Sequence, residues 1–177
     1  MLAHLKPAAV SKLALVDCSP PGMENMDVAH NGLWHYGFHM APDFPEMMTR
    51  GREREYITAQ IRHMAYRKDA ISDATIAEYT RHYARPGGMT AGFNYYRTLP
   101  ADAASFHDQK LAMPVLTIAG KYSAGTGMHP KIQSQAIDSV GVTVDECGHF
   151  VAEEQPEKFC QHLEHFFDHG LPLNRDA

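Results

Sequence analysis

The spacing of three short β-type runs limits the folds that this chain can adopt. Residues 13–16 form a continuous apolar run, residues 115–119 form a β-rich run, and residues 141–144 form a weaker β-rich run. Continuous apolar runs of this length are typical of strands whose two faces are both buried, as in parallel sheets covered by helices. Residues 17–114 separate the first run from the second. The sequence therefore predicts an α/β fold whose short parallel sheet is interrupted by a long insert.

The insert has helical patterns and little strand signal. Its clearest apolar stripe, at positions i, i+4, i+7 and i+8, consists of Ile57, Ile61, Met64 and Ala65. This stripe predicts an amphipathic helix that starts near Pro45. Ser72 is a predicted N-cap for a second helix that runs to about Ala84, where Pro86-Gly87-Gly88 ends it. A third helical stretch continues toward Leu111.

After Met113-Pro114 the pattern is strand, helix, strand, helix. A helix is predicted over residues 131–139, between the second and third runs. Pro156 suits the first turn of a final helix, whose apolar face consists of Phe159, Leu163, Phe166 and Phe167. Because three strands make only a small sheet, we expect the first strand to have an exposed edge through which the chain self-associates.

Charge and composition exclude several classes of function. The chain has 16 basic and 21 acidic residues and a net charge of −5, so it lacks the positive surface that binds nucleic acids. The apolar run at residues 13–16 is too short to span a membrane, and three cysteines are too few for a disulfide scaffold. The first residues lack the pattern of a signal peptide. We expect a cytoplasmic protein with a small-molecule substrate and no nucleic-acid or membrane partner.

Two residues with catalytic chemistry follow predicted strands directly. Asp17 comes after the first run, and His149 follows the third run in Cys147-Gly148-His149-Phe150. The carboxyl ends of parallel strands are where ligands bind in open α/β sheets. An aspartate that orients a histidine base supplies two of the three parts of a nucleophile–base–acid arrangement. Taken singly, Asp17 is explained as a turn residue and His149 as a loop histidine, but their order on successive strand ends favours function.

The chain resembles the carboxyl-terminal part of an α/β-hydrolase with its cap domain. Within that superfamily it is most similar to epoxide hydrolases of the bacterial Cif type and to fluoroacetate dehalogenases. The strongest combination is Trp34-His35-Tyr36 together with Asn94-Tyr95-Tyr96-Arg97, and further likeness lies in residues 12–22, 32–45, 51–56, 83–97, 113–120 and 146–156. The resemblance implies a partial hydrolase core at residues 1–22 and 112–177 and an all-helical cap at residues 23–111.

The resemblance also implies roles for individual residues. His149 matches the catalytic histidine, and Asp17 matches the acid after the sixth strand, where the Cif-type enzymes have glutamate. His35 and Tyr96 match the cap pair that donates hydrogen bonds to the epoxide oxygen, a sensible use of an imidazole and a phenol. Without the family context they are explained as a helix-face histidine and a packed tyrosine. The implied substrate-pocket residues, which elsewhere are more often plain core, are Trp34 and Phe38.

The nucleophile is the main departure from this pattern. The 16 residues before Asp17 contain neither Gly-x-Asp-x-Gly nor Gly-x-Ser-x-Gly, and no oxyanion-hole segment. Ser123 follows the acid and has Lys121 where a nucleophile elbow needs glycine, so it is interpreted as a loop residue. The chain is therefore expected to be an incomplete hydrolase that is inactive alone.

Alternative functions remain open from the sequence. The alternatives are a haloacid dehalogenase and, without catalysis, a truncated cap-bearing module. Tyr36, in the position where the dehalogenases have tryptophan, favours the epoxide. No cofactor or metal is expected, because the histidines of the final helix fit a solvated face better than a metal site. These histidines are His162, His165 and His169.

Overall fold

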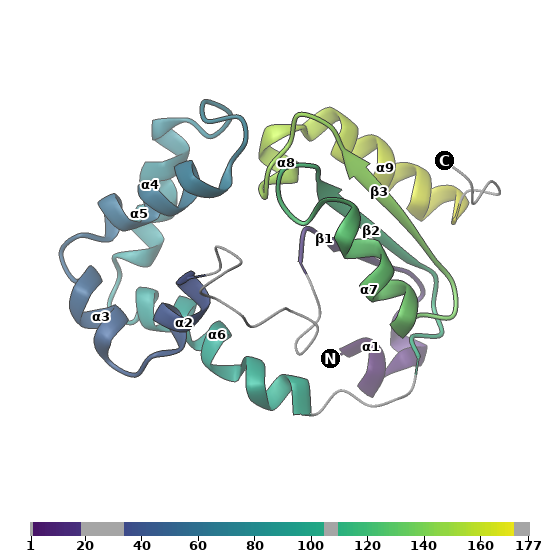
Figure 1. Cartoon of the computed structure of the whole chain (residues 1–177), viewed down its shortest axis with the longest axis horizontal. Helices are drawn as coiled ribbons and strands as arrows, with labels where there is room; N and C mark the ends of the chain where they lie inside the picture. Colours follow the sequence, from purple (N-terminus) through teal and green to yellow (C-terminus); the bar gives the residue numbers. More distant parts are fainter. Residues whose placement is uncertain (1, 19–33, 105–109, 172–177) are drawn as a thin grey trace. The chain divides into compact units, whose positions relative to one another are not determined.

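The computed structural model describes residues 2–18, 34–104 and 110–171. Figure 1 shows the order of its helices and strands. The elements near the amino terminus are α1 (Leu2–Leu5), η1 (Pro7–Ala9) and β1 (Leu13–Val16). They are followed by α2 (Trp34–Met40), α3 (Phe44–Thr49), α4 (Glu53–Met64), α5 (Asp73–Tyr83) and α6 (Gly88–Ala104). The remaining elements are β2 (Val115–Gly120), η2 (Gly125–Gly127), α7 (Met128–Gln135), β3 (Ser139–Val144), α8 (Val151–Glu154) and α9 (Pro156–His169).

The three strands form one parallel sheet in the order β1-β2-β3. Leu13 pairs with Val115, and Val115 pairs with Ser139 on its other side. Every residue of the central strand β2 is buried, which confirms the interpretation of the apolar runs. Within the described residues β1 has a strand partner on one side only, as expected.

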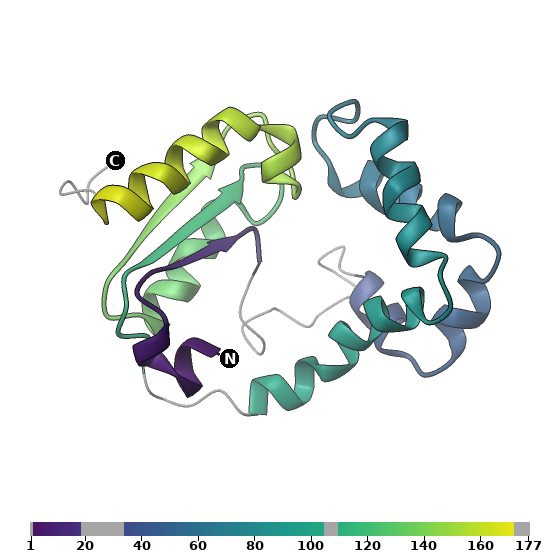
Figure 2. The ribbon, with the colours of Figure 1, turned by 180° about the vertical axis from the view of Figure 1, so that it is seen from behind.

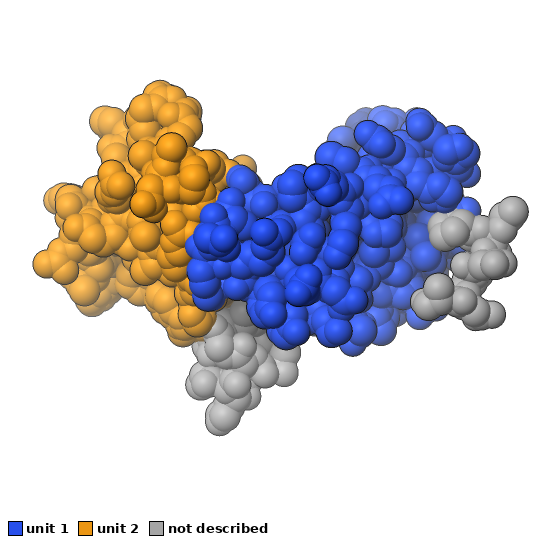
Figure 3. All heavy atoms as spheres, turned by 90° about the horizontal axis from the view of Figure 1, so that it is seen from above, with its two compact units in different colours: residues 1–20, 64–70, 106–177 blue, residues 21–63, 71–105 orange. Residues whose placement is uncertain are grey.

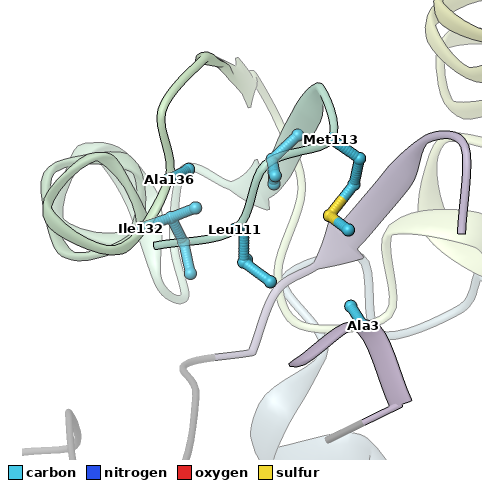
Figure 4. Close-up of a cluster of buried hydrophobic side chains, with 6 residues drawn as sticks. Ala3, Leu111, Met113, Ile132 and Ala136 are labelled. Carbon is cyan, nitrogen blue, oxygen red and sulfur yellow. The ribbon is translucent and has the colours of Figure 1, made fainter. Parts of the chain in front are cut away.

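Helices cover both faces of the sheet, with α7 on one side and α9 on the other (Figures 1 and 2). Alternate side chains of the strands point to opposite faces, because successive residues of a strand do so. On the α7 side they pack in a cluster of buried residues with Ile132 (Figure 4). On the α9 side Leu116 and Ile118 pack with Phe166, and Phe159 and Leu163 join the same cluster. Phe167, predicted on this apolar face, is instead 49% exposed.

The chain divides into two compact units (Figure 3). The sheet unit consists of residues 1–20, 64–70 and 106–177, and the helical unit of residues 21–63 and 71–105. The division differs from the expected cap range at residues 64–70, which belong to the sheet unit. Their backbone amides at Tyr66 and Arg67 donate hydrogen bonds to the buried carboxylate of Glu154, and this long-range pairing has no local signal in the sequence.

The helical unit differs from the sequence prediction at one break. The single helix expected from Pro45 to Ala65 is wrong, because Gly51 adopts a φ of +74° and separates α3 from α4. The predicted N-cap is confirmed, since the Ser72 hydroxyl accepts a hydrogen bond from the Thr75 amide at the start of α5. The predicted end of this helix is confirmed at its C-cap residue Ala84.

The helix predicted over residues 131–139 is wrong at both ends. The observed helix, α7, begins at Met128 and ends at Gln135. Ala136 instead forms a parallel bridge with Leu111, and the Ile137 amide donates to the Leu111 carbonyl. These long-range backbone bonds hold Ala136 in extended conformation and end the helix before β3.

Candidate active site

Asp17 occupies the end of β1 and is almost fully buried, at 4% exposed. Its φ of +46° is a left-handed conformation that aspartate tolerates better than most residues. Oδ1 accepts a hydrogen bond from the Gly120 amide at 2.9 Å, and Oδ2 accepts one from the Ser123 hydroxyl at 2.5 Å. The Ala124 amide approaches Oδ1 at 3.4 Å. The loop after β2 therefore fixes the carboxylate in one orientation.

His149 is the partner of this carboxylate. Its Nδ1 lies 2.7 Å from Asp17 Oδ2, and its side chain is 36% exposed. A carboxylate can only accept a hydrogen bond, so in the neutral imidazole this contact places the proton on Nδ1 and leaves a lone pair on Nε2. An imidazole held in that tautomer is suited to take a proton from water or a hydroxyl.

Two glycines allow the segments around this pair to approach closely. A Cβ atom on Gly120 would lie 1.8 Å from the Gly148 carbonyl oxygen. A Cβ atom on Gly148 would lie 2.4 Å from the Tyr66 amide nitrogen and 2.6 Å from the Met64 carbonyl oxygen. Glycine is required at both positions because backbone, which cannot move aside as a side chain does, occupies the space.

Ser123 and Cys147 are the other reactive side chains near the pair. Ser123 was expected to be a plain loop residue, but its hydroxyl donates to Asp17, so it supports the acid. A search for nucleophile elbows misses this role, because a supporting hydroxyl needs no sequence motif. The Cys147 thiol is fully buried, and burial, with the nearby Glu154 and Asp17 carboxylates, raises its pKa to about 12. The thiol is therefore neutral at pH 7 and is no nucleophile.

The helical unit brings His35 and Tyr96 together. Their ring centroids are 5.9 Å apart and the rings are nearly perpendicular. His35 is 7% exposed, on α2, and Tyr96 is partly buried, on α6. Burial, reinforced by Tyr83, raises the pKa of the Tyr96 phenol, so its hydroxyl stays protonated and able to donate a hydrogen bond at neutral pH.

His39, one turn after His35, extends this aromatic cluster. Its Nε2 lies 2.5 Å from the Tyr56 hydroxyl, and its ring centroid lies 4.3 Å from that of Tyr96. Burial and the adjacent His35 lower the pKa of His39 to about 4, so its imidazole is neutral at pH 7. No sequence motif assigns a role to this residue, which lies four positions after His35 on α2.

The two expected substrate-pocket residues are next to each other on α2. Trp34 is 49% exposed and Phe38 is partly buried, with ring centroids 6.1 Å apart. Exposure of large aromatic surface is compatible with a ligand contact, and their role stays a prediction. Part of the segments that carry the family resemblance, residues 19–22 and 32–33, lies outside the described residues.

The described part of the chain has neither a metal-binding cluster nor a membrane-spanning helix. No group of three or more histidine, cysteine, aspartate or glutamate side chains there could hold a metal ion. No helix there is long and apolar enough to cross a membrane.

Comparison with known proteins places this geometry in a fold family. No family model matches the chain. The candidate alpha/beta hydrolase ALR0039 from Nostoc sp PCC 7120 superposes with a TM-score of 0.85 at 27% identity, over 95% of this chain and 61% of that one. The chain has part of the α/β-hydrolase fold. Asp17 directly follows β1, and His149 lies in the loop between β3 and α8.

Two further α/β-hydrolase relatives are epoxide hydrolases by name. The ligand-free epoxide hydrolase CorEH superposes with a TM-score of 0.81 at 25% identity, over 94% of this chain and 62% of that one. A soluble epoxide hydrolase from Corynebacterium sp. (strain C12) is 35% identical over 95 residues, which are 52% of this chain and 33% of that protein. The chain thus spans less than two thirds of the length of each relative.

Proposed function

We propose that this chain is the base- and cap-bearing part of an epoxide hydrolase that opens a small epoxide through an aspartyl-ester intermediate. The observation that carries the proposal is the 2.7 Å contact between Asp17 and His149, which orients Nε2 of an accessible imidazole as a base. The epoxide hydrolases among the relatives and the cap pair His35 and Tyr96 support the choice of substrate.

The first chemical step is ring opening. A carboxylate oxygen of an aspartate nucleophile attacks one epoxide carbon, the carbon–oxygen bond of the ring breaks, and the oxygen gains negative charge. The Tyr96 hydroxyl and an N–H of His35 donate hydrogen bonds to that oxygen, which takes a proton from solvent water to become a hydroxyl. Donors aimed at developing charge stabilise the transition state more than the substrate. In this proposal the nucleophile comes from a segment outside these 177 residues.

The second step hydrolyses the ester. His149 Nε2 takes a proton from water, and the resulting hydroxide attacks the ester carbonyl carbon. The alkyl–oxygen group leaves and takes the proton that the attacking hydroxide brought, so that a diol and the free carboxylate are formed. The imidazolium of His149 releases its proton to solvent, which balances the proton taken up in the first step. Asp17 stabilises the imidazolium that exists during this step and keeps the ring in the required tautomer.

The test separates the two steps by intact-protein mass. The protein is expressed with the coding residues that lie in frame upstream of Met1, and it is mixed with styrene oxide. In the His149→Ala variant the ester forms without being hydrolysed, so we expect the protein mass to rise by that of one substrate and diol turnover to fall on the order of 10⁴-fold. The wild type should turn over without accumulating the adduct.

A matched variant checks that the effect belongs to the site. His165→Ala removes an exposed histidine of α9 and should leave both readouts at wild-type values. Turnover in His149→Ala within tenfold of wild type would refute the proposal, as would an absence of adduct together with normal substrate binding. The 177-residue chain alone should form no diol, and diol formation by it that His149→Ala abolishes would reveal a nucleophile within the chain.

A further inference from the structure

The carboxylate of Glu154 accepts four hydrogen bonds, all from backbone amides, and the proposed mechanism gives it no role. Glu154 lies at the end of α8 and is 0% exposed. Its Oε2 accepts three backbone hydrogen bonds at 2.9 Å, from the amides of Tyr66, Arg67 and Gly148. Its Oε1 accepts a fourth, from the Phe150 amide at 3.1 Å. Since the side chain has no solvent contact, it is unsuited to exchange protons with a substrate.

Two of these four donors flank His149 directly. Gly148 and Phe150 are its chain neighbours, and the amide of His149 itself donates to the Met64 carbonyl at 3.2 Å. Three consecutive backbone N–H groups are thereby held, the outer two by Glu154 and the middle one by the segment of residues 64–70. That segment is fastened to the same carboxylate by two amides, and the Arg67 guanidinium donates to the Glu154 carbonyl at 2.8 Å.

We propose that Glu154 is a positioning residue for His149, and that it acts through a clasp formed by its carboxylate, residues 148–150 and residues 64–70. The clasp fixes the backbone on both sides of the imidazole, so the ring meets Asp17 in one orientation. A displacement of about 1 Å between reacting groups can cost about 10²-fold in rate. The catalytic meaning of the clasp rests on the proposed function of His149, whereas its effect on the orientation of the ring does not.

The chemistry of the clasp predicts how a conservative variant fails. All four partners are donors, so a carboxylate satisfies them with two oxygens. Glu154→Gln supplies one oxygen and one NH₂ group. If the glutamine oxygen faces the amides of Tyr66, Arg67 and Gly148, these three hydrogen bonds are kept. The NH₂ group then faces the Phe150 amide, and because both groups are donors, that hydrogen bond is lost. The variant should therefore fold and should release His149 on its Phe150 side.

The test is the tautomer of His149 in the 177-residue chain, read from long-range ¹H–¹⁵N spectra at neutral pH. In the wild type we expect a single tautomer with the proton on Nδ1. In Glu154→Gln we expect both tautomers and a solvent exchange of the Nδ1 proton that is about tenfold faster. A factor of about ten corresponds to the free energy of one lost hydrogen bond to a charged group. Glu164→Gln removes the same charge from an exposed position of α9 and should match the wild type.

Other outcomes are equally decisive. A well-dispersed spectrum of Glu154→Gln with the wild-type tautomer and exchange rate would overturn the inference, as would mixed tautomers in the wild type. If Glu154→Gln does not fold, the Arg67→Ala variant provides the test, because it removes only the hydrogen bond from the guanidinium to the Glu154 carbonyl. Faster exchange of the His149 Nδ1 proton in this variant supports the clasp, and an unchanged rate overturns it. If the tautomer of His149 depends on Glu154 while the protein with its upstream residues forms no diol, the clasp stands and the proposed function is refuted.

Discussion

His39 should make the stability of the helical unit depend on pH. Its imidazole is 7% exposed, and burial followed by the proximity of His35 lowers its pKa from 6.5 to about 4. In the unfolded chain the same group has its ordinary pKa of about 6.5. Between these two values the unfolded state binds more protons than the folded state, so the free energy of unfolding rises with pH. The stabilisation is present above pH 6.5 and is lost as the pH falls toward 4.

The size of the effect follows from the two pKa values. A change from 6.5 to about 4 corresponds to about 3 kcal/mol, at 1.36 kcal/mol for each pKa unit. Screening by solvent at the edge of the cluster lowers the expected effect to about 2 kcal/mol. This is a large part of the stability of a small unit, since whole domains are stable by about 5–15 kcal/mol.

Trp34 provides the assay. It is the one tryptophan of the chain and lies in the helical unit, so its fluorescence follows the unfolding of that unit. Urea unfolding is measured at pH values from about 4 to 7 and extrapolated to water. His39→Gln retains a side-chain N–H for the Tyr56 hydroxyl and cannot titrate, so between pH 5 and 6.5 its free energy of unfolding should depend on pH less steeply than that of the wild type. Glu46 and Glu78, whose pKa values are lowered by ion pairs, add a pH dependence below pH 5 in both proteins. His82→Gln, at an exposed position of α5, should keep the wild-type slope.

Two results would refute this reasoning. One is a pH dependence in His39→Gln that equals that of the wild type. The other is a wild-type free energy of unfolding that falls as the pH rises from 4 to 6.5.

Further predictions concern the site, the edge of the sheet and the core. In the protein with its upstream residues, Tyr96→Phe should lower diol formation by about 10²–10³-fold, the equivalent of about 2.7–4 kcal/mol, and fluoride release from fluoroacetate that exceeds diol formation would contradict the assignment. Ser123→Ala should destabilise the sheet unit by about 1.5 kcal/mol in urea unfolding followed by circular dichroism, because Asp17 loses a donor, and Thr126→Ala should have no effect. The chain should self-associate at micromolar concentration through β1, whereas a clean monomer in light scattering would argue against it. Phe166→Ala should cost about 3–5 kcal/mol in urea unfolding, while Phe167→Ala, at a position that is 49% exposed, should cost less than about 1 kcal/mol.

Local patterns were sufficient for the elements that local forces decide. The strand β1 was found because its run is continuously apolar, and β2 because its run is β-rich. The start of α5 was found because Ser72 caps it. The end of α7 was missed, since the pairing of Ala136 with Leu111 joins residues that are distant in the sequence. The break at Gly51 was missed because it lies within a charged stretch where no apolar period is interrupted.

The candidate site divides in the same way. Asp17 and His149 were selected because each follows a strand directly, and the structure brings them within hydrogen-bond distance, although their catalytic role stays a prediction. Ser123 was considered only as a nucleophile, so its hydrogen bond to Asp17 was not foreseen. Glu154 had no signal at all, because two of its four donors belong to residues 66 and 67 and are visible only in three dimensions.

The assignment of residues 64–70 to the sheet unit has a consequence for engineering and for evolution. The chain passes from one unit to the other at residues 20/21, 63/64, 70/71 and 105/106, so the helical unit is not a single insertion. Replacing residues 23–111 with a short linker would delete two amides that Glu154 holds and would leave a buried anion with fewer partners, a costly loss. A helical unit exchanged between proteins of this fold must therefore be joined by two separate grafts on either side of residues 64–70, or it carries part of the support of His149 away with it.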